Sequence, residues 1–408
     1  MSAETALPLF SACGIELEYM IVDSDGLNVL PACDELLRAA AGEVVADFED
    51  GPIAWSNELS LHVVEVKTNG PAARLDGLAA RFLDGVRRAN TWLAPIGGRL
   101  MPGAMHPWMN PHLETRLWPH GDSAIYEAFN RIFDCRGHGW ANLQSMHVNL
   151  PFADDTQFRS LHDAVRLLLP LLPALAASSP ILESRLTGWM DTRLEVYRRN
   201  AERIPSITGL VVPEPISSRR EYEARILAPM YSDIAASDPD GVLRHEWLNA
   251  RGAIARFERN TIEVRVLDMQ ETPAQDIAIA ETIIATLKRL AGNPGDAPPG
   301  IDTPVLARIL QDVARDAELA VIDRIDFLAS LGFPDRRCEA RELWGFLLES
   351  LPSDPAGRKD IDFILASGCL ARRIARAVGT DCRPPRMRET WRVLCECLET
   401  GCRFEGID

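Results

Sequence analysis

Glutamates recur at alternate positions in segments whose pattern predicts β-strands. Glu16 and Glu18 lie two residues apart in the apolar run 12–23, so both side chains point to one face of the predicted strand. Glu65 alternates with valines in a second predicted strand, 59–67, and Glu58 directly precedes that strand. Like charges on one half-buried face are unfavourable, and a cation between them would remove this cost.

Two further predicted strands carry polar pairs on one face. Residues 261–267 present Glu263 and Arg265, and residues 141–150 present His147 and Asn149. Oxygen ligands with one imidazole suit Mg²⁺ or Mn²⁺. A carboxylate-lined sheet with an arginine nearby suits phosphates bridged by such ions. The alternative is an amphipathic sheet whose polar face meets water. Because the polar positions are almost all glutamate, without the usual mixture of Thr and Lys, we favour a functional site.

Three arginines precede the strand 261–267, at positions 251, 256 and 259. One interpretation is a solvated basic surface, and the other is a set of contacts to the phosphates of an adenosine nucleotide. The spacing of Arg251, Arg256 and Arg259 does not decide between them.

Several common catalytic motifs are absent from the sequence. Lysine occurs only at positions 67, 288 and 359, and none of these lysines follows a glycine, so a GxxxxGK[ST] phosphate loop is excluded. No GxSxG, HExxH or CxxC motif occurs. Chemistry in this chain must therefore use carboxylates, arginines and a few histidines.

The predicted strands are separated by helices and by long irregular stretches. Helices are expected at 34–41, 72–93, 155–177 and 273–290, and the Gly- and Pro-rich stretch 292–304 is typical of a linker followed by short helices. This mixture predicts an α+β fold with an antiparallel or mixed sheet and segregated helices. We expect a catalytic domain over residues 1–293 and a helical extension over residues 294–408.

Composition and charge exclude several classes of protein. The 408 residues are 47% apolar and carry a formal net charge of −16, most of it within residues 1–300. This acidity argues against a nucleic-acid partner. The first ten residues lack a basic, apolar leader, and no apolar run is long enough to predict a membrane span. Nine cysteines without a secretory signal are typical of reduced thiols, so we expect a cytoplasmic protein.

Six segments of the chain, taken together, resemble glutamate–cysteine ligase family 2, the carboxylate–amine ligases. They recur in family order over about residues 12–293: GIELEYMIVD (14–23), NELSLHVVEVKTNGP (57–71), PGAMHP (102–107), QSMHVNLPF (144–152), ASSPILESRLTGWMDTR (177–193) and RNTIEVRVLDMQETP (259–273). The resemblance implies a fold like the catalytic domain of glutamine synthetase. In that fold an antiparallel sheet curves around a funnel, which ATP and the amino acid enter from opposite sides.

The resemblance also implies roles for individual residues. The ligands of Mg²⁺ or Mn²⁺ would be Glu16, Glu18, Glu58, Glu65, His147 and Glu263. Arg265 would face the transferred phosphoryl group, and Arg265 and Glu58 are the candidate catalytic residues. Arg251, Arg256, Arg259 and Arg265 would contact the nucleotide. Arg193 would bind the substrate carboxylate, with Asn149 and Trp189 nearby.

The function that follows is an ATP-dependent ligase that joins a carboxylate to an amine through an acyl phosphate, giving an amide or γ-glutamyl-type peptide bond. Its partners would be small amino acids and amines, with a homo-oligomer left open. Two segments depart from the family pattern, Ser145–Asn149 and Leu186–Trp189, and they put glutamate and cysteine in doubt as substrates. The alternatives are a degenerate regulatory protein that binds metal and nucleotide, and a phosphotransferase acting on a guanidino or carboxyl substrate.

Overall fold

An eight-stranded antiparallel sheet forms the centre of the computed structural model, which describes residues 6–121, 123–292 and 300–407. All of its registered strand pairs are antiparallel. The strand order is β2 (Asp47–Asp50), β3 (Ile53–Asn57), β4 (Val63–Thr68), β1 (Gly14–Asp23), β6 (Ser145–Pro151), β10 (Thr261–Asp268) and β9 (Ala253–Arg256), and β5 (Gly98–Met101) pairs with β1 off this path.

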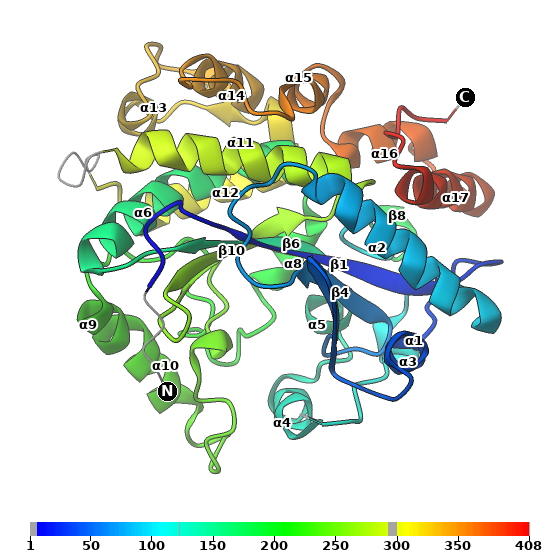
Figure 1. Cartoon of the computed structure of the whole chain (residues 1–408). Coiled ribbons are helices and arrows are strands. Elements are labelled where there is room, and N and C mark those ends of the chain that lie inside the picture. The colour runs from blue at the N-terminus through cyan, green and yellow to red at the C-terminus, as the bar shows by residue number, and fades with distance from the viewer. Residues whose placement is uncertain (1–5, 122, 293–299, 408) are drawn as a thin grey trace.

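One face of the sheet is apolar and covered by helices. The alternate residues Ile15, Leu17 and Tyr19 of β1 are fully buried on this face, and each buried side chain of this size contributes roughly 1.5–3 kcal/mol. The covering helices are α2 (Leu78–Leu93), α6 (Asp155–Leu168) and α11 (Pro273–Ala291). Helices α2 and α6 both pack on α11, which crosses the sheet in Figure 1. Helix α11 begins as the sequence predicts, with Thr272 Oγ1 accepting a hydrogen bond from the Gln275 N–H and proline at the first turn.

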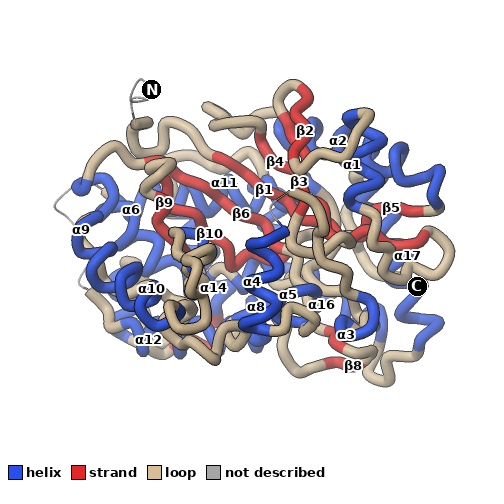
Figure 2. Tube along the Cα trace, turned by 90° about the horizontal axis from the view of Figure 1, so that it is seen from below, coloured by secondary structure: helices blue, strands red, loops and turns tan. Residues whose placement is uncertain are grey.

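The opposite face of the sheet is framed by short helices and loops, and Figure 2, which looks onto it, shows the strands between them. These elements are α3 (Pro111–Glu114), α4 (Ser123–Phe133), α5 (His138–Ala141), α8 (Thr192–Tyr197), α9 (Arg219–Tyr222), the π-helix η3 (Glu223–Leu227), α10 (Ala228–Ile234), η4 (Glu246–Leu248) and the hairpin of β7 (Ile181–Leu182) with β8 (Arg185–Leu186). The polar residues of the strands point to this side. Two further short helices, α1 (Cys33–Ala41) and η1 (Ala94–Ile96), contact α2.

The C-terminal quarter is helical, apart from a two-stranded sheet of β11 (Val321–Ile322) and β12 (Cys338–Glu339). Its helices are α12 (Thr303–Asp316), η5 (Ala317–Leu319), α13 (Ile325–Ser330), α14 (Ala340–Glu349), α15 (Arg358–Ser367), α16 (Leu370–Val378) and α17 (Pro384–Thr400). Helices α14 and α15 pack on α11, and α17 packs on α2 and β5 (Figure 1). The expected α+β fold with a helical extension is thus confirmed, while the domain boundary at residue 293 stays a prediction.

Some element boundaries differ from the sequence-based expectation. The predicted strand 59–67 begins only at Val63, and the preceding strand β3 was not predicted. The predicted helix 155–177 is interrupted by the 3-10 turn η2 (Leu169–Leu171) before α7 (Pro173–Ala176), because prolines 170 and 173 cannot donate the backbone hydrogen bonds that a continuous helix needs. The predicted linker 292–304 lies partly outside the described residues. Within the described ranges, no helix is both long and apolar enough to cross a bilayer.

Candidate active site

A cleft of about 1590 Å³ opens on the polar face of the sheet. Among the described residues, eight acidic and five basic side chains line it. The acidic residues are Glu16, Glu18, Asp47, Glu49, Glu58, Glu65, Glu258 and Glu263, and the basic ones are Lys67, Arg193, Arg256, Arg259 and Arg265. The cleft is therefore rich in charge of both signs.

Strand register brings the predicted strand-borne residues together. Glu16 pairs directly with His147 across β1 and β6, and Glu18 pairs with Glu65 across β1 and β4. Glu263 of β10 lies opposite Asn149 of β6. Directly opposed residues of an antiparallel pair share a face, so these residues from four neighbouring strands form one continuous polar surface.

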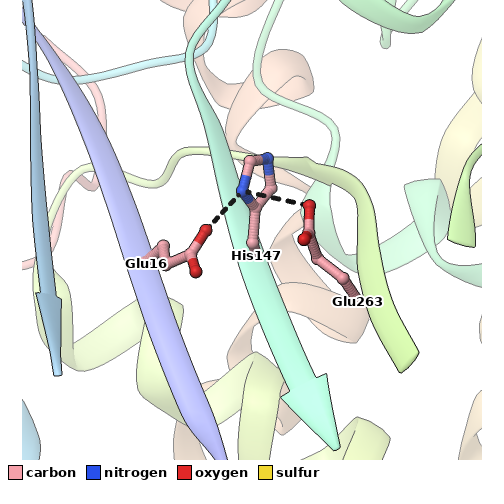
Figure 3. A group of neighbouring side chains, drawn as sticks. All are labelled: Glu16, His147 and Glu263. Atoms are coloured by element: carbon pink, nitrogen blue, oxygen red, sulfur yellow. Dashed lines mark hydrogen bonds and ion pairs between the residues drawn. The ribbon is translucent and has the colours of Figure 1, made fainter. Parts of the chain in front are cut away.

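Glu16, His147 and Glu263 form the tightest group (Figure 3). His147 Nδ1 lies 2.9 Å from Glu16 Oε2 and 3.9 Å from Glu263 Oε1. One ligand atom from each of the three residues falls within 4.8 Å of the others. Burial would raise the pKa of Glu16, but the hydrogen bond and the charge of His147 outweigh it and lower this pKa to about 2. Burial would likewise lower the pKa of His147, but its hydrogen bond to Glu16 and the surrounding glutamates raise it to about 9.

Three further glutamates extend this group toward the end of the cleft near β3. Glu18 Oε2 accepts hydrogen bonds from the Ser145 backbone N–H at 2.6 Å and from its hydroxyl at 3.0 Å. Burial, then repulsion from Glu18 and Glu65, holds the pKa of Glu58 well above its usual value. Burial, then the charge of Glu16, raises the pKa of Glu65 to about 7 despite the ammonium of Lys67 at 3.1 Å.

This donor set fits a divalent cation. Five carboxylates and one imidazole converge, which is the ligand chemistry that Mg²⁺ and Mn²⁺ accept. The raised pKa values of Glu58 and Glu65 show that their negative charges are poorly compensated by the protein alone. At Glu16 and Glu263 the protein itself offers a partner, since His147 Nδ1 lies 2.9 Å from Glu16 Oε2 and Arg265 Nη2 lies 2.5 Å from Glu263 Oε1.

Arg265 reaches the cleft through an irregularity in β10. The register between β10 and β6 shifts by one residue between Val264 and Leu267, and the Arg265 backbone N–H donates instead to Gly252 O at 3.0 Å. The Arg265 guanidinium donates to Glu263 Oε1 through Nε at 2.9 Å and Nη2 at 2.5 Å. The Arg265 guanidinium thus lies beside the Glu16–His147–Glu263 group, in a position where it could bind a phosphate.

The three arginines predicted as nucleotide contacts occupy different positions. Arg256 lines the cleft and lies 3.3 Å from Glu263 Oε2, and the exposed Arg259 lines it on the turn between β9 and β10. Arg251 differs from the prediction. It is buried, it is held by both carboxylate oxygens of Glu214 at 2.6 and 2.7 Å, and it is not among the residues that line the cleft.

Two of the three predicted substrate-binding residues line the cleft, and the third does not. Asn149 lines the cleft and donates to Glu16 Oε1 at 3.0 Å. Arg193 lines the cleft too, but it is buried and its Nε donates to the buried Asp268 at 2.5 Å. Trp189 is not a lining residue, because it packs outside the cleft under the guanidinium of Arg315, 5.6 Å from the ring centre.

Several residues of the cleft were missed by sequence reasoning. Aromatic side chains of α4 and α5, Tyr126, Phe129 and Trp140, line one end of it. Tyr126 and Phe129 belong to the apolar pattern of α4, and apolar residues at helical spacing usually mark a core, so nothing local identifies them as site residues. Gly139 of α5 packs closely on the segment that follows α8, because a Cβ at this position would lie only 3.0 Å from Asn200 Cβ.

The fold occurs in solved ligase structures. A glutamate–cysteine ligase of Francisella tularensis, in complex with AMP, matches 95% of this chain and 89% of its own with a TM-score of 0.58 and 13% identity. A bifunctional glutathione synthetase of Pasteurella multocida matches 96% of this chain and 53% of its own with a TM-score of 0.63 and 14% identity. At this identity the likeness concerns the fold alone.

The sequence, in contrast, shows the family. The chain belongs to glutamate–cysteine ligase family 2, whose model matches residues 12–315, and the resemblance found in the motifs is confirmed. A protein of Archaeoglobus fulgidus, named only as uncharacterized, is 36% identical over 67% of this chain and 73% of its own length. A protein of Bradyrhizobium sp. (strain ORS 278), provisionally named glutamate–cysteine ligase 2, is 28% identical over 69% of this chain and 62% of its own length.

Proposed function

We propose that the protein is an ATP-dependent ligase that joins a small carboxylate to an amine and releases ADP and phosphate. The observation that carries this proposal is the Glu16–His147–Glu263 group with Arg265 beside it, inside one cleft of a chain that belongs to a ligase family. The carboxylate oxygen would attack the γ-phosphorus of ATP to give an acyl phosphate and ADP. The amine would then attack the acyl carbon, lose a proton and displace phosphate.

The residues of the cleft suit these two steps. Divalent ions held by Glu16, Glu18, Glu58, Glu65, His147 and Glu263 would neutralise the phosphate oxygens of ATP. Arg265 would orient the transferred phosphoryl group, and Arg256 and Arg259 would contact the polyphosphate from the turn between β9 and β10. Phosphoryl transfer depends on positioning and charge compensation more than on a protein nucleophile. This fits a site that offers carboxylates and arginines.

The test is an ADP-release assay with Mg²⁺ or Mn²⁺, run with amino acids and amines singly and in pairs, followed by mass spectrometry of the product. We expect ADP release to require both substrates, and the product to be their amide. Glu16→Gln should abolish turnover, whereas Glu396→Gln, at an exposed position of α17 far from the cleft, should leave it unchanged. A stable phosphorylated product formed without an amine would identify a phosphotransferase instead. Tight ATP binding without turnover would indicate a regulatory protein.

A further inference from the structure

One end of the cleft is lined by large apolar side chains, which we call the aromatic wall: Leu59, Tyr126, Phe129, Trp140 and Leu143. All five line the cleft and all are partly exposed. In an otherwise charged cleft, such a surface in contact with water is unfavourable until a ligand covers it.

The aromatic wall lies beside the carboxylates at the Ser145 end of β6. Asn57 Nδ2 donates both to the Glu58 carbonyl oxygen at 3.2 Å and to the Tyr126 hydroxyl at 3.0 Å. Leu143 precedes Ser145 by two residues, and Ser145 donates to Glu18. The turn that carries Arg259 pairs instead at Pro151, the other end of β6, about 20 Å away for a strand of this length. The end of the cleft with Arg259 is therefore separate from the end with the aromatic wall, so the proposed polyphosphate and an apolar group would bind at different ends.

The aromatic wall is held in place by its own contacts. Trp140 Nε1 donates to Asn200 O at 3.1 Å, and the Trp140 ring lies 5.1 Å from Phe129 and stacks on Phe133 at 5.3 Å. Because the only polar atom of the indole is already hydrogen-bonded, the ring offers the cleft an apolar surface. A ligand that covers it has few side chains to order, which favours binding.

The cations nearest to this end of the cleft already have carboxylate partners. None of the five basic residues of the cleft belongs to the segments that form the wall. Lys67 is paired with Glu65 and Asp47, and Arg193 is paired with Asp268. Arg265 is likewise paired with Glu263. A carboxylate placed against the apolar side chains of the wall would lose hydration at a cost in free energy.

From these observations we propose that one of the two substrates carries an aromatic or large aliphatic group that packs on the aromatic wall. The short acidic chain of glutamate and the small thiol of cysteine do not fill this position. The inference rests on the proposed ligase function and specifies its substrate class.

The test is a matrix of substrates with the full chain, ATP and Mg²⁺, reading ADP release. L-glutamate, L-leucine and L-phenylalanine serve as carboxylates, and ammonia, L-cysteine and phenethylamine as amines. We expect pairs that contain a phenyl or isobutyl group to have the highest kcat/KM. Since an aromatic contact of this kind changes affinity by about threefold to tenfold, Trp140→Leu should raise the KM of that substrate by such a factor and leave the KM of ATP unchanged.

Two further variants make the result specific. Leu59 belongs to a loop, so Leu59→Ala removes part of the aromatic wall without changing the packing of α5. This variant should also raise the KM of the substrate that carries the phenyl or isobutyl group. Trp92→Leu removes another partly exposed tryptophan, which packs on Phe48 and Trp55 and does not line the cleft, and it should leave KM unchanged. Fastest turnover with glutamate and cysteine, with KM values that Trp140→Leu does not alter, would overturn the inference while the ligase function stands.

A lack of turnover with every pair would instead count against the ligase function, and binding then decides the inference. Calorimetric titration compares 3-phenylpropionate and phenethylamine with acetate and methylamine. Tighter binding of a phenyl compound that is lost in Trp140→Leu would support the aromatic subsite, and equal or absent binding would overturn it.

Discussion

The buried ion pair of Arg193 and Asp268 should be a major source of stability, and Asp268→Asn tests it. Both side chains are at most 1% exposed, and their atoms approach to 2.5 Å. Asp268 Oδ2 also accepts hydrogen bonds from the Ser178 backbone N–H at 2.8 Å and the Ser179 hydroxyl at 2.7 Å. The substitution would remove the nearest counter-charge of the buried Arg193 guanidinium and leave Asp191 and Glu18 as its remaining acidic neighbours. Breaking a buried ion pair in this way typically costs about 3–5 kcal/mol.

This cost predicts a measurable shift in melting temperature. For a chain of 408 residues the unfolding entropy is about 0.9 kcal/mol/K, so Asp268→Asn should lower Tm by about 4–6 °C. Differential scanning calorimetry is the assay. Asp312→Asn is the control, because Asp312 forms an ion pair with Arg315 in which both side chains are nearly half exposed, and its loss should change Tm by less than about 1 °C.

A double-mutant cycle separates the pair from its surroundings. Arg193→Met removes the stranded charge, so the double variant should be more stable than the sum of the two single changes predicts, by about 1–3 kcal/mol. The reasoning is refuted if Asp268→Asn shifts Tm no more than the control, or if the two changes are additive.

Three other predictions concern the active site and the core. Arg265→Lys should lower the kcat for ADP release by at least about tenfold, because lysine cannot reproduce the planar two-point contact; unchanged kcat would remove Arg265 from the proposed mechanism. Burial lowers the pKa of His162 to about 3. The unfolded chain therefore binds a proton below about pH 6.5 that the folded protein does not, and the wild type loses stability as the pH falls. Between pH 6 and 4, the unfolding free energy of His162→Leu, measured with guanidinium, should fall by about 1.4 kcal/mol per pH unit less than that of the wild type. Equal pH dependence of the two proteins would contradict this. Gly252→Ala would place a Cβ 2.5 Å from Val266 Cγ1 and should lower the unfolding free energy by about 1–3 kcal/mol, whereas an unaltered Tm would show that the site relaxes.

Sequence alone predicts the strands whose two faces differ. β1, β6 and β10 alternate between apolar and polar residues, and their predicted positions agree with the structure to within a few residues. Strand β3 was missed because four of its five residues, Ile53 to Ser56, are buried and no alternation appears. A strand buried on both faces has the pattern of any short apolar run.

The candidate site could be predicted only where strand register determines it. Cross-strand pairing follows from the alternation, so the convergence of Glu16, His147 and Glu263 is implicit in the sequence. The position of Arg251 depends on Glu214, which lies 37 residues away in the chain, and that of Trp189 depends on the packing of Arg315. Such long-range partners leave no local signal, so neither side chain could be placed in advance.

The register shift in β10 has a consequence for how this protein can vary. Glu263 and Asp268 are five positions apart, so in a regular strand they would point to opposite faces. The one extra residue between Val264 and Leu267 places Asp268 opposite Ser145, on the same face as Glu263. Deleting a single residue there would restore an even ladder and rotate Asp268 toward the helix-covered side, away from Arg193. Natural variants of this strand should therefore tolerate substitution far better than any change in its length.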